Sequence, residues 1–238
     1  MEKNSPVSII IPVHNSARHL ECTIDAIRER MAECGMGSYE ICIAEDGSTD
    51  HSAKIAKSLA NKYSNVRAFT FPSRLGKGAA LSSAIRKCNH GKILFLDSDL
   101  SSGTSEIPQA ILLLDDYDMV AGSRHMAGAQ CKRAGHRAIL GKIYCHLANM
   151  LFPKGISDYQ CGFKSFRKEK MLALLEKVKS KGWFWDTEVI LLAKSSDWKI
   201  KELPVRWEER ESTSLNVLET GAELLCSLLL FRLNAPRV

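Results

Sequence analysis

Two carboxylates follow an apolar run in the first half of the sequence: Asp97 and Asp99 come directly after KILFL, residues 92 to 96. Acidic side chains at the end of a buried strand are costly unless a cation or hydrogen bonds offset their charge. Mg²⁺ and Mn²⁺ prefer oxygen ligands, and Mg²⁺ is often held by one or two carboxylates together with substrate phosphates. The pair therefore predicts a metal site for Mg²⁺ or Mn²⁺, with a solvated turn or a helix cap as the alternative.

Two further polar motifs come just after expected strands. Glu45, Asp46 and Gly47 form a turn, and a carboxylate there can accept a hydrogen bond from a nucleobase N–H. Gly76 and Lys77 belong to a Gly-Lys-Gly sequence that opens an expected helix. A helix N-terminus favours anions, and glycine lets the backbone approach a ligand. The spacing matches neither a Walker loop nor a dinucleotide fingerprint.

Ser123 and Arg124 follow another expected strand and begin a segment without acids. From residue 119 to 157 there is no Asp or Glu, and the basic residues are Arg124, Lys132, Arg133, Arg137, Lys142 and Lys154. These charges predict a local positive field. A solvated surface, a phosphate site and an anionic membrane surface all remain as interpretations. Clustered cations without interleaved aromatics do not favour nucleic acid.

Aromatic residues are dense in two later runs, residues 158–164 and 183–185, and Asp186 follows the second. Such runs line a core more often than a ligand site. Asp186 has two interpretations, a helix cap and a site carboxylate.

The elements that position these motifs alternate between strands and helices. Strands are expected at residues 7–11, 39–44, 66–71, 92–96 and 119–122, with helices between them. This alternation predicts an α/β fold with mostly parallel strands and helices on both faces. Ligands in such folds bind beyond the carboxyl ends of the strands.

The second half is less regular, ending in a helix expected at residues 216–233. We expect a catalytic domain at 1–215 and, at 216–238, an amphipathic helix packed on it or lying at a membrane surface. Glu219, Glu223 and Arg232 make that helix too charged to span a membrane.

Composition sets the broad class of the protein. The 238 residues are 45% hydrophobic and 25% charged, with a net charge of +6, which fits a globular domain. The eight cysteines show no CxxC spacing, and the N-terminus lacks a leader pattern. We therefore expect a reducing, cytoplasmic setting with peripheral membrane association.

The motifs in their order resemble the inverting family-2 glycosyltransferases of GT-A fold: IIIPVHN, EDGSTD, GKGAAL, FLDSDL and GSR. The later runs DYQCGFKSF, WFWDTEVILLA and ELPVRWEER resemble the branch that makes polyprenyl-phosphate sugars, including dolichyl-phosphate glucose and mannose synthases. Together these runs cover roughly residues 6–215. QCGFK is closer to the glucosyl members.

The resemblance implies roles for individual residues. Catalysis would depend on Asp97, Asp99 and Asp186, with Asp97 and Asp99 also holding the metal. The nucleotide sugar would be bound by Pro12, Val13, Asn15, Glu45, Asp46, Gly47, Lys77, Asp97, Ser98 and Arg210. The acceptor phosphate would be bound by Ser123, Arg124, Arg133 and Arg137. Ser101 stands where some mannosyl members carry a further metal ligand, a glutamine.

The implied reaction is transfer of a hexose to a polyprenyl phosphate with inversion. Glucose from UDP-glucose is favoured, and mannose from GDP-mannose is next. A phosphate acceptor is already ionised near neutral pH, so catalysis would rest on positioning and on neutralising the leaving diphosphate. The alternatives are transfer to a sugar hydroxyl, with Asp186 or Glu188 as general base, and a nucleotide-sugar-binding module without turnover.

Overall fold

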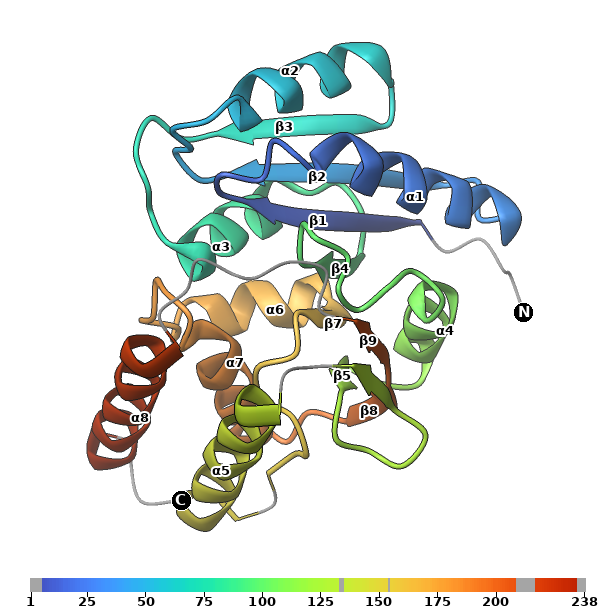
Figure 1. Cartoon of the computed structure of the whole chain (residues 1–238). Helices are drawn as coiled ribbons and strands as arrows, with labels where there is room; N and C mark the ends of the chain where they lie inside the picture. Colours follow the sequence, from blue (N-terminus) through green and yellow to red (C-terminus); the bar gives the residue numbers. More distant parts are fainter. Residues whose placement is uncertain (1–5, 133–134, 154, 209–216, 235–238) are drawn as a thin grey trace.

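The computed structural model of the protein describes residues 6–132, 135–153, 155–208 and 217–234. Strands alternate with helices through the first half of the chain (Figure 1). The strands are β1 Val7–Val13, β2 Tyr39–Glu45, β3 Val66–Thr70, β4 Lys92–Leu96, β5 Met119–Ser123, β6 Gln130–Lys132, β7 Phe163–Arg167, β8 Ile200–Pro204 and β9 Arg206–Glu208. The helices are α1 Leu20–Glu33, α2 Ser52–Lys62, α3 Lys77–Lys87, α4 Ile107–Leu112, α5 Gly135–Leu151, α6 Lys168–Leu175, α7 Trp185–Ser195 and α8 Val217–Asn234.

A seven-stranded sheet crosses the molecule in the order β3-β2-β1-β4-β7-β5-β8. β1 pairs in parallel with β2 and β4, and β5 pairs in parallel with β8. β7 is antiparallel to both of its neighbours, β4 and β5. Its register sets Phe163 opposite Leu96 and Lys164 opposite Phe95. The residues just before β7 therefore lie beside the carboxyl end of β4.

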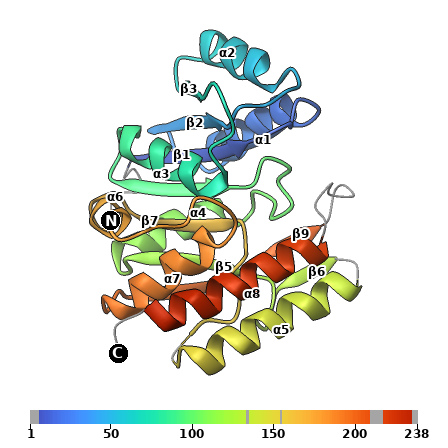
Figure 2. The same cartoon turned by 90° about the vertical axis from the view of Figure 1, so that its left-hand side faces the viewer.

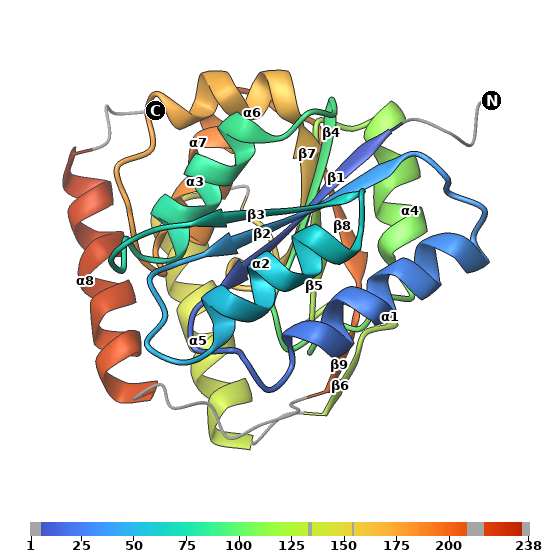
Figure 3. The same ribbon diagram turned by 90° about the horizontal axis from the view of Figure 1, so that it is seen from above.

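Apolar residues pack on both faces of the sheet, because alternate side chains of a strand point to opposite faces. Ile9 and Ile11 belong to the core that packs with α1, α2 and α4. Ile10 and Phe95 belong to the core that packs with α3, α6 and α7. Figure 3 shows these two groups of helices on opposite sides of the sheet. With both faces covered, the strand ends are where polar groups can meet a ligand.

The predicted strands and helices are confirmed except in two details. Pro12 does not end β1, which continues to Val13. Pairing with β4 stops at Ile10, so the missing N–H of Pro12 interrupts no ladder on that side. The second detail is β6, which the sequence does not signal. All of its residues are exposed, and it pairs in parallel with β9 in a separate two-stranded sheet.

Helix α8 packs beside α5 along one of its sides (Figure 2). Leu228 is buried, and the ring of Phe231 lies 5.8 Å from that of Phe152 and 5.9 Å from that of Phe184. The opposite side of α8, which includes Leu229, is exposed. Among the described helices, none combines the length and the apolarity that crossing a bilayer requires.

Candidate functional site

The acidic pair Asp97 and Asp99 lies in a tight turn at the carboxyl end of β4. The Asp97 side chain is 28% exposed. Asp99 accepts hydrogen bonds from the backbone N–H and the hydroxyl of Ser101, at 2.9 and 2.6 Å. Leu100, which lies between Asp99 and Ser101, has a φ of 50°, in the left-handed region that few residues with side chains adopt. These hydrogen bonds of Asp99 thus stabilise the turn that contains Asp97 and Asp99.

Gly162 packs directly on Asp97. The backbone N–H of Asp97 donates to the carbonyl of Gly162 at 3.1 Å. A Cβ at position 162 would lie 1.7 Å from Oδ2 of Asp97 and 2.2 Å from its Cγ. The antiparallel register of β7 produces this approach, and only glycine leaves the Asp97 carboxylate in place.

Four charged side chains form a row that runs from Asp97 into the core. Nζ of Lys77 lies 3.0 Å from Oδ1 of Asp97 and 3.3 Å from Oδ2 of Asp186. Nζ of Lys164 lies 2.6 Å from Oδ1 of Asp186 and also donates to the carbonyl of Cys161 at 2.6 Å. The charges alternate along the row, so each buried charge has a partner of opposite sign.

These neighbours set the protonation of the row. Burial alone would raise the pKa of Asp186, but the ammonium groups of Lys164 and Lys77 outweigh it and hold the pKa below the usual aspartate value. Burial raises the pKa of Asp97, and Asp99 and Asp186 add to this effect while Lys77 opposes it. Burial would lower the pKa of Lys77, but Asp186 and Asp97 raise it overall. Lys77 is therefore cationic, and Asp186 is a weak base near neutral pH.

The second acid of α7, Glu188, is buried and already bonded through both oxygens. Its Oε1 accepts the backbone N–H of Lys179 at 3.0 Å, and its Oε2 accepts that of Ser180 at 2.7 Å. Glu188 thus fixes the loop that leads into α7. Both carboxylates are thus already engaged, Glu188 by backbone N–H groups and Asp186 by two ammonium groups, whereas a general base needs a carboxylate free to take a proton.

The turn after β2 is tied to the start of α3. The carboxylate of Asp46 accepts the backbone N–H groups of Leu75 and Gly76, at 2.6 and 3.0 Å. Gly76 has a φ of 101°, and a Cβ there would lie 2.5 Å from the carbonyl oxygen of Lys181. Asp46 therefore positions the residue that precedes Lys77, a function that its sequence motif alone does not suggest.

The turn after β1 joins the same edge. The side-chain oxygen of Asn15 accepts the backbone N–H of Thr49 at 2.8 Å, and Oγ of Ser16 lies 2.9 Å from Oγ of Ser98. Glu45 accepts the backbone N–H of Ser48 at 2.6 Å. The structure thus gathers, along adjoining strand ends, the predicted nucleotide-sugar positions Pro12, Val13, Asn15, Glu45, Asp46, Gly47, Lys77, Asp97 and Ser98. Arg210 lies outside the described residues.

Residues 8–175 match the profile of glycosyl transferase family 2. The chain belongs to this family. Glycosyltransferase AglD of Haloferax volcanii is 30% identical over an alignment of 226 residues, and the match covers 92% of this chain and 36% of AglD. Dolichyl-phosphate beta-glucosyltransferase ALG5C of Trichomonas vaginalis is 28% identical over an alignment of 222 residues, and the match covers 88% of this chain and 66% of that relative. The chain thus spans less than two thirds of either relative.

Among solved structures, the fold is similar to glucosyl-3-phosphoglycerate synthase from Mycobacterium tuberculosis in complex with Mn²⁺, UDP and glucosyl-3-phosphoglycerate. The TM-score is 0.74 at 19% identity, covering 98% of this chain and 81% of that one. This likeness confirms the GT-A fold that the sequence motifs imply.

The acidic turn of this family-2 transferase fits a small divalent cation. Asp97 and Asp99 supply carboxylate oxygens of the type that Mg²⁺ and Mn²⁺ prefer. Both are partly exposed, and the missing Cβ of Gly162 leaves the space that the Asp97 carboxylate occupies. A cation held by these two carboxylates would have coordination positions left for a diphosphate and water.

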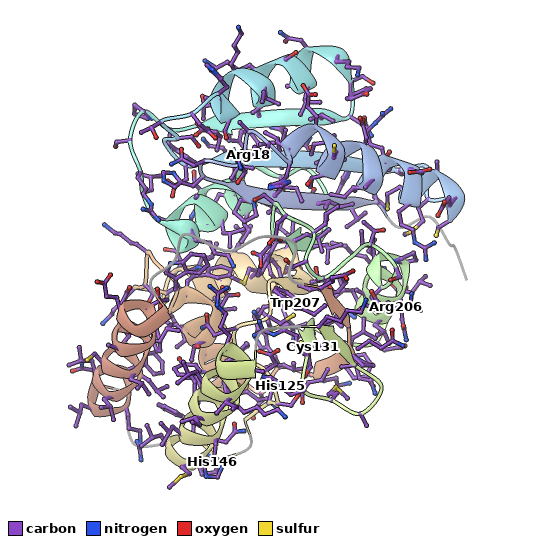
Figure 4. All side chains as sticks on the ribbon, in the orientation of Figure 1. Arg18, His125, Cys131, His146, Arg206 and Trp207 are labelled. Carbon is purple, nitrogen blue, oxygen red and sulfur yellow. The ribbon has the colours of Figure 1, made fainter. Side chains whose placement is uncertain are left out.

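Arg124 of the transferase is placed differently from the expectation of a free phosphate ligand. It is buried, and its Nε and Nη2 donate to Asp158 at 2.7 and 2.8 Å, while its backbone N–H donates at 3.0 Å. Burial would raise the pKa of Asp158, but Arg124 lowers it to about 2. The guanidinium also lies 4.8 Å from the ring centre of Trp207, which Figure 4 labels close to Cys131. A phosphate contact by Arg124 would compete with this ion pair and stays a prediction.

The rest of the expected acceptor site is only partly covered by the described residues. Ser123 is buried, with its hydroxyl 2.6 Å from that of Ser157. Arg137 is half-buried on α5, and Lys132 pairs with Glu208 at 3.2 Å. Arg133 and Lys154 lie outside the described residues. Part of the predicted positive field is therefore neutralised by local acids.

Three residues of the transferase that build the site have no role predicted from the sequence: Gly162, Lys164 and Asp158. Lys164 stands inside the apolar run FKSF of a buried strand. Lysine is almost never fully buried without a partner, so a lysine in a buried strand indicates a buried acidic partner such as Asp186. Gly162 and Asp158 lie in the run that the motifs singled out, but their partners are distant in sequence.

Proposed function

We propose that this family-2 transferase moves a hexose, with glucose favoured over mannose, from a nucleotide-diphosphate sugar to a polyprenyl phosphate. UDP-glucose is the favoured donor, and GDP-mannose is the next. The dolichyl-phosphate glucosyltransferase relative supports the acceptor, and the similar solved structure supports UDP and Mn²⁺. The configuration at the anomeric carbon inverts because the acceptor attacks it directly.

The observation that carries this proposal is the state of Asp186. A sugar hydroxyl must lose a proton as it attacks, which requires a nearby base. Asp186 lies between Lys77 and Lys164, and Glu188 is bonded to backbone N–H groups through both oxygens. An acceptor that arrives ionised, such as a phosphate monoester, needs no such base.

In this proposal, different residues of the site bind the metal, the nucleotide and the acceptor phosphate. Asp97 and Asp99 would hold Mg²⁺ or Mn²⁺, which when bound neutralises charge on the donor diphosphate. Lys77 adds a second positive charge beside Asp97. The strand-end residues Pro12, Val13, Asn15, Glu45, Asp46 and Gly47 would hold the nucleotide, together with Ser98 and Arg210. Ser123, Arg124, Arg133 and Arg137 remain the proposed acceptor-phosphate ligands, with Arg124 acting only if its pair with Asp158 opens.

A membrane surface is the proposed setting, because two neighbouring helices expose apolar residues. On α5, Ile139, Ile143 and Met150 are 60, 49 and 66% exposed, and their spacing of four and seven residues places them on one side of the helix. On α8, Leu229 and Leu233 are 53 and 80% exposed. We call these five residues the apolar crest.

The apolar crest fits the headgroup region of a bilayer better than another protein surface. Figure 2 shows α5 and α8 side by side, and Figure 4 labels His146 of α5 near the outer edge of the molecule. Lys142 and Arg232 are exposed on the same two helices. Apolar residues flanked by cations are typical of binding to anionic lipid surfaces.

The activity test is a matrix of donors and acceptors with Mn²⁺ or Mg²⁺ present. UDP-glucose and GDP-mannose are each offered to dolichyl phosphate, to 3-phosphoglycerate and to a sugar alcohol acceptor. We expect transfer from UDP-glucose to dolichyl phosphate and none to the alcohol. Transfer to the alcohol alone would overturn the phosphate-acceptor proposal, and donor binding without any transfer would favour the binding module.

The membrane test is flotation with vesicles of phosphatidylcholine and phosphatidylserine. We expect Ile143→Glu combined with Leu229→Glu to lower the bound fraction about tenfold or more, because each buries a charge in the headgroup region. Leu112→Glu is the matched control, since Leu112 is 46% exposed on α4, outside the apolar crest. Unchanged flotation of the double variant would refute the proposal. So would a wild type that does not float but forms a dimer that the double variant disrupts.

A further inference from the structure

Lys77 contacts both acidic groups of the site at once. Its Nζ is 3.0 Å from Oδ1 of Asp97 and 3.3 Å from Oδ2 of Asp186, and its side chain is 11% exposed. Asp97 is also the carboxylate that would bind a divalent cation. The ammonium and such a cation would therefore compete for the same carboxylate.

The surroundings of Lys77 limit where its ammonium can go. Its backbone begins α3, directly after Gly76, which Asp46 holds through a hydrogen bond of 3.0 Å. The rings of Phe95 and Trp183 lie 5.6 and 5.2 Å from Nζ. With aromatic faces beside it, the ammonium has two carboxylate partners within reach, Asp97 and Asp186.

Asp186 is built as a fixed partner rather than a mobile one. Its side chain is 2% exposed, and its other oxygen is held by Lys164 at 2.6 Å. Lys164 is itself anchored on the carbonyl of Cys161 and has no exposed side-chain surface. The Asp186 oxygen that faces Lys77 is therefore held in place independently of the contact between Lys77 and Asp97.

We propose that Lys77 is an internal competitor for the metal site and that Asp186 is the second position to which its ammonium withdraws. Because Asp97 and Asp99 are two residues apart, the ammonium offsets part of their mutual repulsion until a divalent cation does so. After withdrawal, Lys77 remains within the site, where the donor diphosphate would need a cation. This inference rests on the proposed metal role of Asp97 and Asp99.

The test is Mn²⁺ binding without nucleotide, measured by electron paramagnetic resonance of free Mn²⁺. The proteins are the wild type, Lys77→Met, Asp186→Asn and the double variant. We expect Lys77→Met to tighten Mn²⁺ binding about tenfold and Asp186→Asn to weaken it, because Lys77 then has only Asp97 as a partner. In the Lys77→Met background, Asp186→Asn should change the affinity by less than about twofold.

Lys92→Met is the matched control, because Lys92 makes a comparable ion pair with Asp115 at 2.7 Å and lies at the opposite end of β4 from Asp97. It should leave Mn²⁺ affinity unchanged. Asp186→Asn alone leaves the buried Lys164 without an anionic partner and could prevent folding. In that case Asp186→Asn is combined with Lys164→Met, which removes both charges of the pair. The same comparison is then completed in the Lys77→Met background.

Two results would overturn the inference. One is Mn²⁺ binding by Lys77→Met that is absent or no tighter than in the wild type. The other is an equal loss on Asp186→Asn in both backgrounds, which would make Asp186 an ordinary nearby charge. The metal role itself is judged separately by Asp97→Asn, which should abolish Mn²⁺ binding in either background, and by transfer to lipid phosphate.

Discussion

Gly162→Ala tests whether the shape of the site depends on the approach of β7 to the acidic turn. A Cβ at position 162 would meet Oδ2 of Asp97 at 1.7 Å, whereas ordinary contacts begin at 3.4 Å. The oxygen must therefore retreat by about 1.7 Å, the difference between these two distances. Misplacement of a reacting group by about 1 Å is enough to lower a rate about 100-fold.

We expect Gly162→Ala to weaken Mn²⁺ binding about tenfold or more and to lower kcat about 100-fold. Stability should fall by only about 1–3 kcal/mol, because the carboxylate can rotate away without moving the strands. Calorimetric titration, steady-state kinetics and urea unfolding measure the three effects. Gly91→Ala is the control, since a Cβ there meets nothing within 4 Å. A stable Gly162→Ala protein with wild-type metal affinity and rate would refute the link between this glycine and the metal site.

Three further predictions concern buried contacts. Arg124→Ala leaves Asp158 buried without its cation and should destabilise the fold by about 3–5 kcal/mol in urea unfolding. Because the pKa of Asp158 is about 2 when folded against 3.8 ordinarily, its contribution is complete above about pH 4 and is lost as pH falls through 2. Acid titration of the unfolding free energy should show a loss of about 2 kcal/mol across that window. Gly78→Ala places a Cβ 2.5 Å from that of Trp185 and should cost about 1–3 kcal/mol by the same urea assay.

The local pattern of apolar residues is sufficient to predict most of the helices and strands of the fold. Continuous β-branched runs predict strands buried on both faces, and the spacing of Leu20, Ile24, Ile27 and Met31 predicts α1, where all four are buried. What local pattern does not contain is the position of β7. Its residues read as a short strand, but nothing in them says that the strand enters between β4 and β5 in the opposite direction.

In the candidate site, too, local sequence predicts some features, whereas contacts between distant segments determine others. Asp97 and Asp99 were predicted from neighbours in the sequence, because the apolar run before them is adjacent. Arg124 was predicted to be available because the sequence around it has no acid, yet Asp158 binds its guanidinium from 34 residues away. A pattern of charges along the chain describes the local field only where the fold brings in no distant partner.

The insertion of β7 has consequences for both halves of the proposed reaction. The strand brings Gly162 against Asp97, which leaves room for that carboxylate, and brings Lys164 to Asp186, which would make that carboxylate a poor base in the proposed reaction. In the proposed reaction, the preference for an ionised acceptor would then be set in the core rather than by the surface cations. Exposed Lys142 should influence encounter with an anionic acceptor, an effect that salt screens. The buried pair of Lys164 and Asp186 is shielded from salt and, in the proposed reaction, would favour an acceptor that arrives already ionised.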